Sequence, residues 1–182
     1  ANQVIEDPAV DIVVEVIGGE TVAKTLTLKA LSLKKHVVTA NKALLAAHGN
    51  ELVVAARQNE VDLAFEASTG GCMPIIKALR ESLVANSIRS MSAILNGTCN
   101  YILTKISKDG SEFEQALKKA QELGFAEAEP SLDIEGHDTA HKLAILNSLA
   151  HGMEINLKDI HVEGITQITP LDIEYARNFG YT

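Results

Sequence analysis

The 182-residue sequence has no tryptophan, only two cysteines and no long apolar run. Cys72 and Cys99 are too few and too far apart for a disulfide framework or a zinc site, so both are expected to be buried thiols. No segment approaches the roughly 20 apolar residues that cross a bilayer, and the N-terminus lacks the basic and apolar regions of a signal peptide. These absences predict a soluble, cytoplasmic protein with no membrane partner.

Positive charge is also scarce. Sixteen Lys and Arg residues against 24 Asp and Glu residues give a net charge of -8, the wrong sign for a protein that must neutralise phosphates, so no nucleic-acid partner is expected. The hydrophobic fraction of 46% and the charged fraction of 22% are typical of a globular chain and exclude disorder and collagen. Because the sequence starts at Ala1 and not at a methionine, we expect further residues upstream.

The first 67 residues alternate between β-branched runs and helical patterns. Residues 11–17 form an apolar run closed by two glycines, which predicts a strand covered on both faces. The elements expected next are a helix at 21–35, a strand at 36–39, a helix capped by Asn41 and ended by Gly49, a helix at 51–59 and a strand at 61–67. Strands separated by helices predict a parallel sheet.

Ligands of such sheets bind at the carboxyl ends of the strands. Three segments follow the expected strands and should therefore lie along one edge: Gly18-Gly19, Thr39–Lys42 and Ser68–Gly71. After residue 67 the pattern changes, and an α+β region is expected. Its expected elements are a helix at 74–84, a strand at 87–95, a helix at 100–108, a helix at 112–123 opened by a Ser111/Glu114 capping box and ended by Gly124, a loop at 125–136, a helix at 137–151, and a short strand and a helix near 171–178.

Carboxylates are concentrated between residues 127 and 138, directly before a histidine and a lysine. They are Glu127, Glu129, Asp133, Glu135 and Asp138, followed by His141 and Lys142. The ordinary interpretation is an acidic surface loop. However, Asp138 and Lys142 are four residues apart on one helix face, in the orientation that favours an ion pair. A partly buried lysine held by an aspartate is suited to proton donation, and the other carboxylates are suited to a cationic group such as that of an amino acid.

Three weaker patterns leave alternatives open. His137 and His141 resemble the two histidines of a zinc-protease helix, although Asp138 is one methylene shorter than the usual glutamate and no third ligand is evident, so a zinc hydrolase is an alternative. The Gly-rich turn after Glu66 suits either a hard cation or a plain strand-to-helix connection. The turn at 96–98 precedes a helix and favours either an anion or simple capping.

Several segments, in this order along the chain, resemble the homoserine dehydrogenase family. They are Asp11–Gly19, Thr39–Lys42, Glu66–Pro74, Leu95–Leu103 and, most closely, Ala120–Lys142. The resemblance extends from residue 11 to the C-terminus. Two positions depart from the family pattern. Glu129 replaces the usual Asp, Asn or Ser, and Phe125 stands where tyrosine is frequent, which removes one hydroxyl from the pocket.

The resemblance implies an NAD- or NADP-dependent interconversion of L-homoserine and L-aspartate 4-semialdehyde, on the path to threonine, methionine and isoleucine. Lys142 would donate a proton to the aldehyde oxygen, and Asp138 would orient and charge-pair this lysine. Lys42 would assist proton transfer. The other implied roles are substrate binding by Glu127, Asp133, Gly97 and Thr98, cofactor binding by Gly18, Ala40, Lys42 and Gly124, and a sodium site made by Glu66 with the backbone carbonyls of Thr69, Gly71 and Met73.

Members of this family begin with a Gly-rich turn that grips the dinucleotide pyrophosphate, and no Gly-x-Gly-x-x-Gly occurs here. The resemblance therefore predicts an internal fragment of α/β class. Residues 1–65 would be the second half of a Rossmann-like parallel-sheet domain, and residues 66–182 a truncated α+β catalytic and dimerisation domain. A homodimer or homotetramer is implied, with residues 87–95 in the dimer sheet. A non-catalytic folding or dimerisation module is the alternative.

Overall fold

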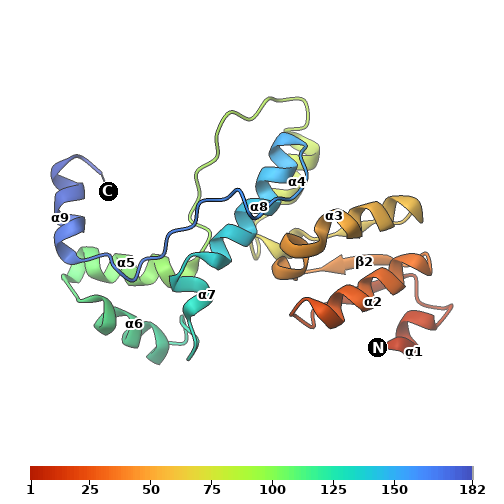
Figure 1. Ribbon diagram of the computed structural model, residues 1–182, viewed down its shortest axis with the longest axis horizontal. Coiled ribbons are helices and arrows are strands. Elements are labelled where there is room, and N and C mark those ends of the chain that lie inside the picture. Colours follow the sequence, from red (N-terminus) through yellow and green to blue (C-terminus); the bar gives the residue numbers. More distant parts are fainter. Residues whose placement is uncertain (182) are drawn as a thin grey trace. The chain divides into compact units, whose positions relative to one another are not determined.

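The computed structural model describes residues 1–181 and is mixed α/β (Figure 1). The chain divides into two compact units. The first, here called the sheet unit, comprises Ala1–Met91 and His141–Ile160, and the second, the helical unit, comprises Ser92–Ala140 and the residues from His161 on. Helix α8 (His137–His151) contributes its first turn to the helical unit and its remainder to the sheet unit. No helix within residues 1–181 combines the length and the apolarity needed to span a membrane.

The sheet unit is built on three parallel strands, as the alternation of strand and helix predicts. They are β1 (Ile12–Glu15), β2 (His36–Thr39) and β3 (Leu63–Ala64), in the order β1-β2-β3. The register pairs Ile12 with His36 and Val37 with Leu63. Because all three strands run in the same direction, their carboxyl ends lie at one edge of the sheet.

Helices connect and cover these strands. They are α1 (Asn2–Glu6), α2 (Thr21–Ser32), α3 (Lys42–Gln58), the 3-10 turn η1 (Glu66–Ser68), α4 (Ile75–Lys77) and the π-helical turn η2 (Ala78–Ser82). Helices α2 and α3 pack against each other. The largest fully buried side chains of this unit come from α2, β2, α3 and α8: Leu31, Val37, Leu44, Leu45, Leu52 and Ile145.

The helical unit contains α5 (Gly97–Asp109), α6 (Phe113–Glu122), α7 (Ser131–Ile134), the first turn of α8 and α9 (Pro170–Asn178). Its core is formed by Ile102, Ile106, Ala116, Ala120 and Ala126. Gly124 has a φ of +76° and ends α6, as the sequence predicts. Two backbone bonds, Phe125 to Ala120 and Gly124 to Gln121, complete the helix ending that a left-handed residue allows.

One expected boundary is wrong because of packing. Gly49 does not end a helix, since α3 runs unbroken from Lys42 to Gln58. A Cβ at Gly49 would lie 2.6 Å from Cδ1 of Ile155. The neighbouring Asn50 holds the same segment with two hydrogen bonds, to the backbone oxygen and from the backbone N–H of Ile155. Glycine therefore lets the 153–158 segment approach α3, at the cost of about 1 kcal/mol in helix propensity.

Four other expectations are corrected. No strand forms at 87–95 or between 160 and 169 in the described residues, because no neighbouring segment offers strand pairing. The Ser111/Glu114 capping box is absent, since α6 begins after Glu112 without a side-chain cap. The loop at 125–136 contains α7. Strand β1 is covered on one face only, because Ile12 and Val14 are 57% and 64% exposed. Apolar side chains occupy both faces of this run, so the sequence does not reveal which face lacks cover.

Candidate functional site

The densest polar cluster of the helical unit is organised by Asn96, the residue that caps α5. Its side-chain oxygen accepts a hydrogen bond of 2.8 Å from the backbone N–H of Cys99. Its amide nitrogen donates to Oδ1 of Asp133 at 2.7 Å and to Oδ2 of Asp138 at 2.8 Å. One buried amide therefore joins the starts of α5 and α8 to the short helix α7.

Thr98 completes the surroundings of Asp133. Its hydroxyl lies 2.9 Å from Oδ2 of Asp133 and 2.7 Å from the backbone oxygen of Phe125, so its single proton serves one of them at a time. Asp133 is half-buried, whereas Asp138 is only 3% exposed. The two carboxylates differ accordingly: Asp133 reaches solvent, and Asp138 faces the protein interior.

The negative charge of this cluster affects the pKa of Cys99. Burial, and then the neighbouring carboxylates of Asp133 and Asp138, raise the pKa of its thiol to about 11. Cys99 is half-buried and Cys72 is exposed, so the expectation of two buried thiols is wrong. Neither cysteine lies in a tightly packed apolar region: Cys72 sits at the exposed tip of the Gly-rich turn with a φ of +62°.

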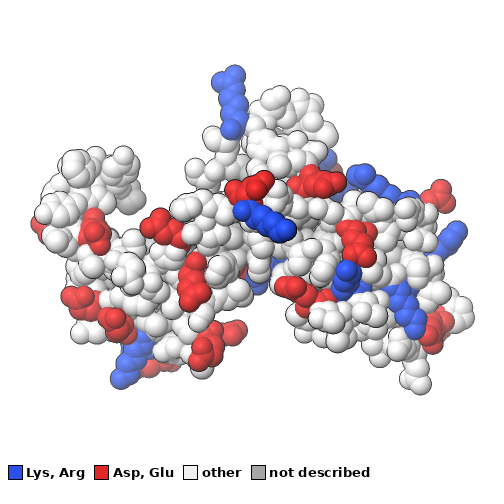
Figure 2. Space-filling view, viewed as in Figure 1, with Lys and Arg blue, Asp and Glu red and all other residues white. Residues whose placement is uncertain are grey.

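An open pocket of about 550 Å³ adjoins this cluster. It is lined by Gly97, Thr98, Asn100, Tyr101, Thr104, Gly124 and Phe125. The rings of Tyr101 and Phe125 lie with their centroids 4.9 Å apart. The pocket brings three of the predicted binding residues together, namely Gly97, Thr98 and Gly124. The face shown in Figure 2 carries mainly acidic side chains over α5 and α6, which suits a cationic group.

At the carboxyl edge of the sheet, a second buried acid joins the two predicted segments. Glu15 is 4% exposed and accepts hydrogen bonds from the Thr39 hydroxyl at 2.5 Å and from the backbone N–H of Ile17 at 2.8 Å. Asn41 caps α3 and donates to the backbone oxygen of Gly19 at 2.7 Å. The ends of β1 and β2 therefore lie side by side, as expected.

Three of the four predicted cofactor residues, Gly18, Ala40 and Lys42, lie at this edge, whereas Gly124 lines the pocket of the helical unit. Gly18 has a φ of +80°, and a Cβ placed on it would meet no atom within 4 Å, so open space adjoins the turn. Ala40 is exposed, and the half-buried Lys42 is the first residue of α3.

Glu66 has a defined structural task. Its two carboxylate oxygens accept the backbone N–H groups of Ile76 and Lys77, at 2.8 and 2.9 Å, and so cap α4. In the same loop, the Thr69 hydroxyl is buried and has no hydrogen-bond partner. Gly71 and Met73 are exposed. The carboxylate retains further lone pairs and the orphaned hydroxyl lies nearby in sequence, so this donor set fits a small monovalent cation.

The other predicted residues occupy the acidic segment and α8. Glu127 is exposed, and Lys142 is half-buried in α8, within the sheet unit. His137 lies 3.6 Å from Glu135. Among residues 1–181, no group of three or more His, Cys, Asp or Glu side chains could hold a metal ion. The zinc-hydrolase alternative is not favoured.

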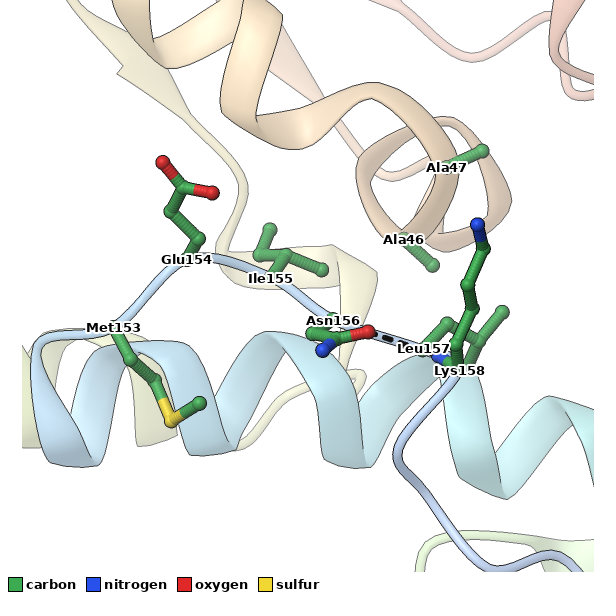
Figure 3. A pocket seen from close by; sticks show the side chains of 8 residues that line it. All are labelled: Ala46, Ala47, Met153, Glu154, Ile155, Asn156, Leu157 and Lys158. Carbon is green, nitrogen blue, oxygen red and sulfur yellow. Dashed lines mark hydrogen bonds between the residues drawn. The ribbon is translucent and has the colours of Figure 1, made fainter.

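A further pocket of the sheet unit lies elsewhere. It is lined by Ala46 and Ala47 of α3 and by the segment from Met153 to Lys158, and Figure 3 shows Lys158 extending beside Ala47. The backbone N–H of Lys158 donates to the Asn156 side chain. Its lining combines small apolar groups with solvated polar ones and holds none of the predicted site residues.

Sequence reasoning missed two residues that organise these sites, Glu15 and Asn96. Each had a signal. Glu15 is the one charged residue inside the apolar run 12–17, where an acid needs buried donors. Asn96 directly precedes a helix, the position of an N-cap, but its contacts with Asp133 and Asp138, 37 and 42 residues away, leave no local trace.

Comparisons with known proteins identify the family of the chain. Residues 1–66 match the family model "Homoserine dehydrogenase, NAD binding domain", and residues 74–182 match "Homoserine dehydrogenase". The chain is 51% identical over 179 residues to the homoserine dehydrogenase of Bacillus subtilis, covering 98% of this chain and 41% of the relative. The Methanocaldococcus jannaschii enzyme is 49% identical, with 98% of this chain and 54% of the relative covered.

Solved structures agree. A homoserine dehydrogenase from Thiobacillus denitrificans superposes with a TM-score of 0.95 at 49% identity, over 98% of this chain and 41% of that one. A hyperthermophilic archaeal homoserine dehydrogenase in complex with NADPH superposes with a TM-score of 0.81 at 30% identity, over 91% and 51%. The chain spans about two fifths of the length of the Bacillus subtilis relative. The two family models together match nearly every residue, and the chain belongs to the homoserine dehydrogenase family.

Proposed function

We propose that the protein containing this chain is an NAD- or NADP-dependent homoserine dehydrogenase, which interconverts L-homoserine and L-aspartate 4-semialdehyde in the biosynthesis of threonine, methionine and isoleucine. The observation that carries the proposal is the pair of carboxylates Asp133 and Asp138, which share the side-chain amide of Asn96, with Asp138 in the first turn of the helix that bears Lys142. Family membership supports the same reaction.

Reduction of an aldehyde requires a hydride at carbon and a proton at oxygen. The bound nicotinamide supplies the hydride. Lys142 donates the proton, because its ammonium group stabilises the negative charge that develops on the oxygen. Asp138 lies one helical turn before Lys142 in α8, on the side from which an acid interacts best with a lysine. In the oxidative direction the neutral lysine accepts the homoserine hydroxyl proton.

Substrate binding is assigned to the acidic segment and the turn before α5. The carboxylates of Glu127 and Asp133 would bind the amino acid's ammonium group, and Gly97 and Thr98 would border the substrate. Gly18, Ala40 and Gly124 would border the cofactor. Lys42 would lie between cofactor and substrate.

Further parts of the proposal concern the cation, the assembly and the domains. Glu66 with the backbone carbonyls of Thr69, Gly71 and Met73 would hold sodium, for which the partnerless Thr69 hydroxyl is the structural support. We also propose a homodimer or homotetramer, a cytoplasmic location, and a domain boundary between residues 65 and 66. The two family models meet close to that boundary.

The test is the rate of homoserine oxidation by the complete protein with NADP and with NAD. Lys142→Ala should lower turnover by a factor on the order of 10²–10⁴, the usual contribution of a general acid or base. Lys118→Ala is the matched control, because Lys118 is an exposed lysine of α6. Near-normal turnover of folded Lys142→Ala would remove this lysine from the proposed role. Absence of homoserine oxidation with both cofactors would refute the activity itself.

A further inference from the structure

Asn96 has two distinct hydrogen-bonding tasks. Its side-chain oxygen caps α5, and its side-chain nitrogen donates to two carboxylates from other helices. The residue is only 7% exposed, so neither task is taken over easily by water. Capping alone needs only the oxygen. The two long-range bonds of the nitrogen therefore require a separate explanation.

The orientation of the amide follows from the chemistry of its partners. The backbone N–H of Cys99 only donates, and an ionised carboxylate only accepts, so oxygen must face Cys99 and nitrogen must face Asp133 and Asp138. Both amide protons are then used. Rotation of the amide by 180° would break all three bonds at once, which locks the side chain in one position.

The two acids would repel each other without this donor. Asp133 and Asp138 each place one oxygen within 2.8 Å of the same nitrogen, so the carboxylates lie close together in a largely buried place. Like charges in such a place favour the uptake of a proton by one of them. The two N–H groups offset the repulsion and hold both carboxylates in fixed directions.

We propose that Asn96 is a positioning residue that holds the carboxylates of Asp133 and Asp138 in the orientation needed for substrate binding and proton transfer. The inference rests on the proposed function, because it acts through Asp138 and the lysine one turn further along α8. Asn96 is assigned no contact with substrate or cofactor. Its effect is to fix the direction of the Asp133 carboxylate, whose other oxygen lies beside the Thr98 hydroxyl, and that of Asp138 in the first turn of α8.

Asn96→Asp separates capping from donation. Asp and Asn are equally good helix caps, and the two side chains have the same size, so α5 should still begin at residue 97. The variant loses both N–H donors and adds a third carboxylate. We expect kcat for homoserine oxidation by the complete protein to fall about 100-fold, the loss caused by a displacement of catalytic groups of about 1 Å. Circular dichroism should remain unchanged.

The pH dependence of kcat distinguishes positioning from mere stability. With a third acid in the cluster, one proton is bound at higher pH, so the acid limb of the profile should move to higher pH. A purely structural role would lower activity evenly and leave the limb in place. The elements of this cluster are α5, α7 and α8. Their titratable groups are Cys99, Tyr101, Lys105, Lys108, Asp109, Asp133, His137, Asp138, His141, Lys142 and His151. Cys99, with its pKa of about 11, does not titrate in the acid limb.

Two further variants complete the experiment. Asn178→Asp makes the same charge change at an exposed residue of α9 and should leave kcat and the profile unchanged. Asn96→Ser keeps a capping oxygen without an added charge, and should also lower kcat; it carries the test if Asn96→Asp does not fold. Folded Asn96 variants with normal kcat and an unmoved acid limb would overturn the positioning role alone. An unmodified protein that does not oxidise homoserine would overturn the proposed function, and the positioning role with it.

Discussion

Each unit of the chain contains a buried acid, and the two acids are satisfied in opposite ways. Glu15, in the sheet unit, receives donors from the Thr39 hydroxyl and from the backbone of the turn that follows its own strand. Asp138, in the helical unit, shares the amide of Asn96 with a second acid. A single carboxylate with several hydrogen-bond donors stabilises the fold by joining the segments that carry those donors. Two carboxylates that share one amide form a negatively charged site able to attract a cation.

The largest expected effect concerns the shared site. Asp138→Asn keeps the size of the side chain and its acceptance from Asn96, but removes the carboxylate that lies one helical turn before Lys142 in α8. We expect kcat for homoserine oxidation to fall on the order of 10³-fold. The free energy of unfolding should change by less than about 1 kcal/mol, because the variant also relieves the repulsion with Asp133. If the variant lost stability but kept its turnover, Asp138 would be a structural acid like Glu15 and not part of the catalytic site.

Glu15→Gln tests the buried acid of the sheet unit, and its expected effect is intermediate. The amide cannot accept from the Thr39 hydroxyl and the Ile17 N–H through two equivalent oxygens, so one buried partner is left unsatisfied. We expect the free energy of unfolding, measured with urea on the complete protein, to fall by about 1–3 kcal/mol. Because the turn at Gly18 is loosened, the KM for the dinucleotide should rise while kcat stays within a few-fold. A loss confined to kcat, with normal stability, would place Glu15 among the reacting groups.

The smallest expected effect is on the rate at which Cys99, next to Asp133 and Asp138, is alkylated. The thiol of Cys99, with its pKa raised to about 11, holds about 100-fold less thiolate at pH 8 than an ordinary thiol of pKa 9.0. Iodoacetamide should therefore label the exposed Cys72 first, and Cys99 far more slowly. Asp133→Asn removes a neighbouring charge and should accelerate Cys99 labelling several-fold. Equal rates with and without Asp133 would mean that this carboxylate does not control the thiol, which would leave burial and Asp138 as the causes.

Local signals identified much of the fold. The β-branched runs at 12–15 and 36–39 form parallel strands, Asn41 caps α3, and the apolar spacing after residue 137 predicts α8 at its observed bounds. Gly124 likewise ends α6 with a positive φ. These features depend on neighbours within about one helical turn or one strand, which a single sequence displays.

The failures have a common physical cause. Glycine is a residue type that often ends helices, so Gly49 predicts a helix end. Glycine is needed at this position because Ile155, more than 100 residues away, packs against it. The run at 87–95 has the pattern of a strand, yet a strand forms only where another segment supplies its backbone partners. The sequence likewise does not predict the exposed face of β1. The alternation along a strand shows which side chains share a face, but not whether another element covers that face.

The sequence by itself determined the family, the parallel order of the first strands, and the acids and lysines of the candidate site, since these follow from residue types at fixed spacing. Tertiary structure alone decided which acids share a donor. The meeting of Asn96, Asp133 and Asp138 requires three helix ends to converge, and the tie from Glu15 to Thr39 requires two strands to pair in register. Hydrogen bonds reach only about 3 Å, so contacts between residues distant in sequence arise only once packing has brought them together.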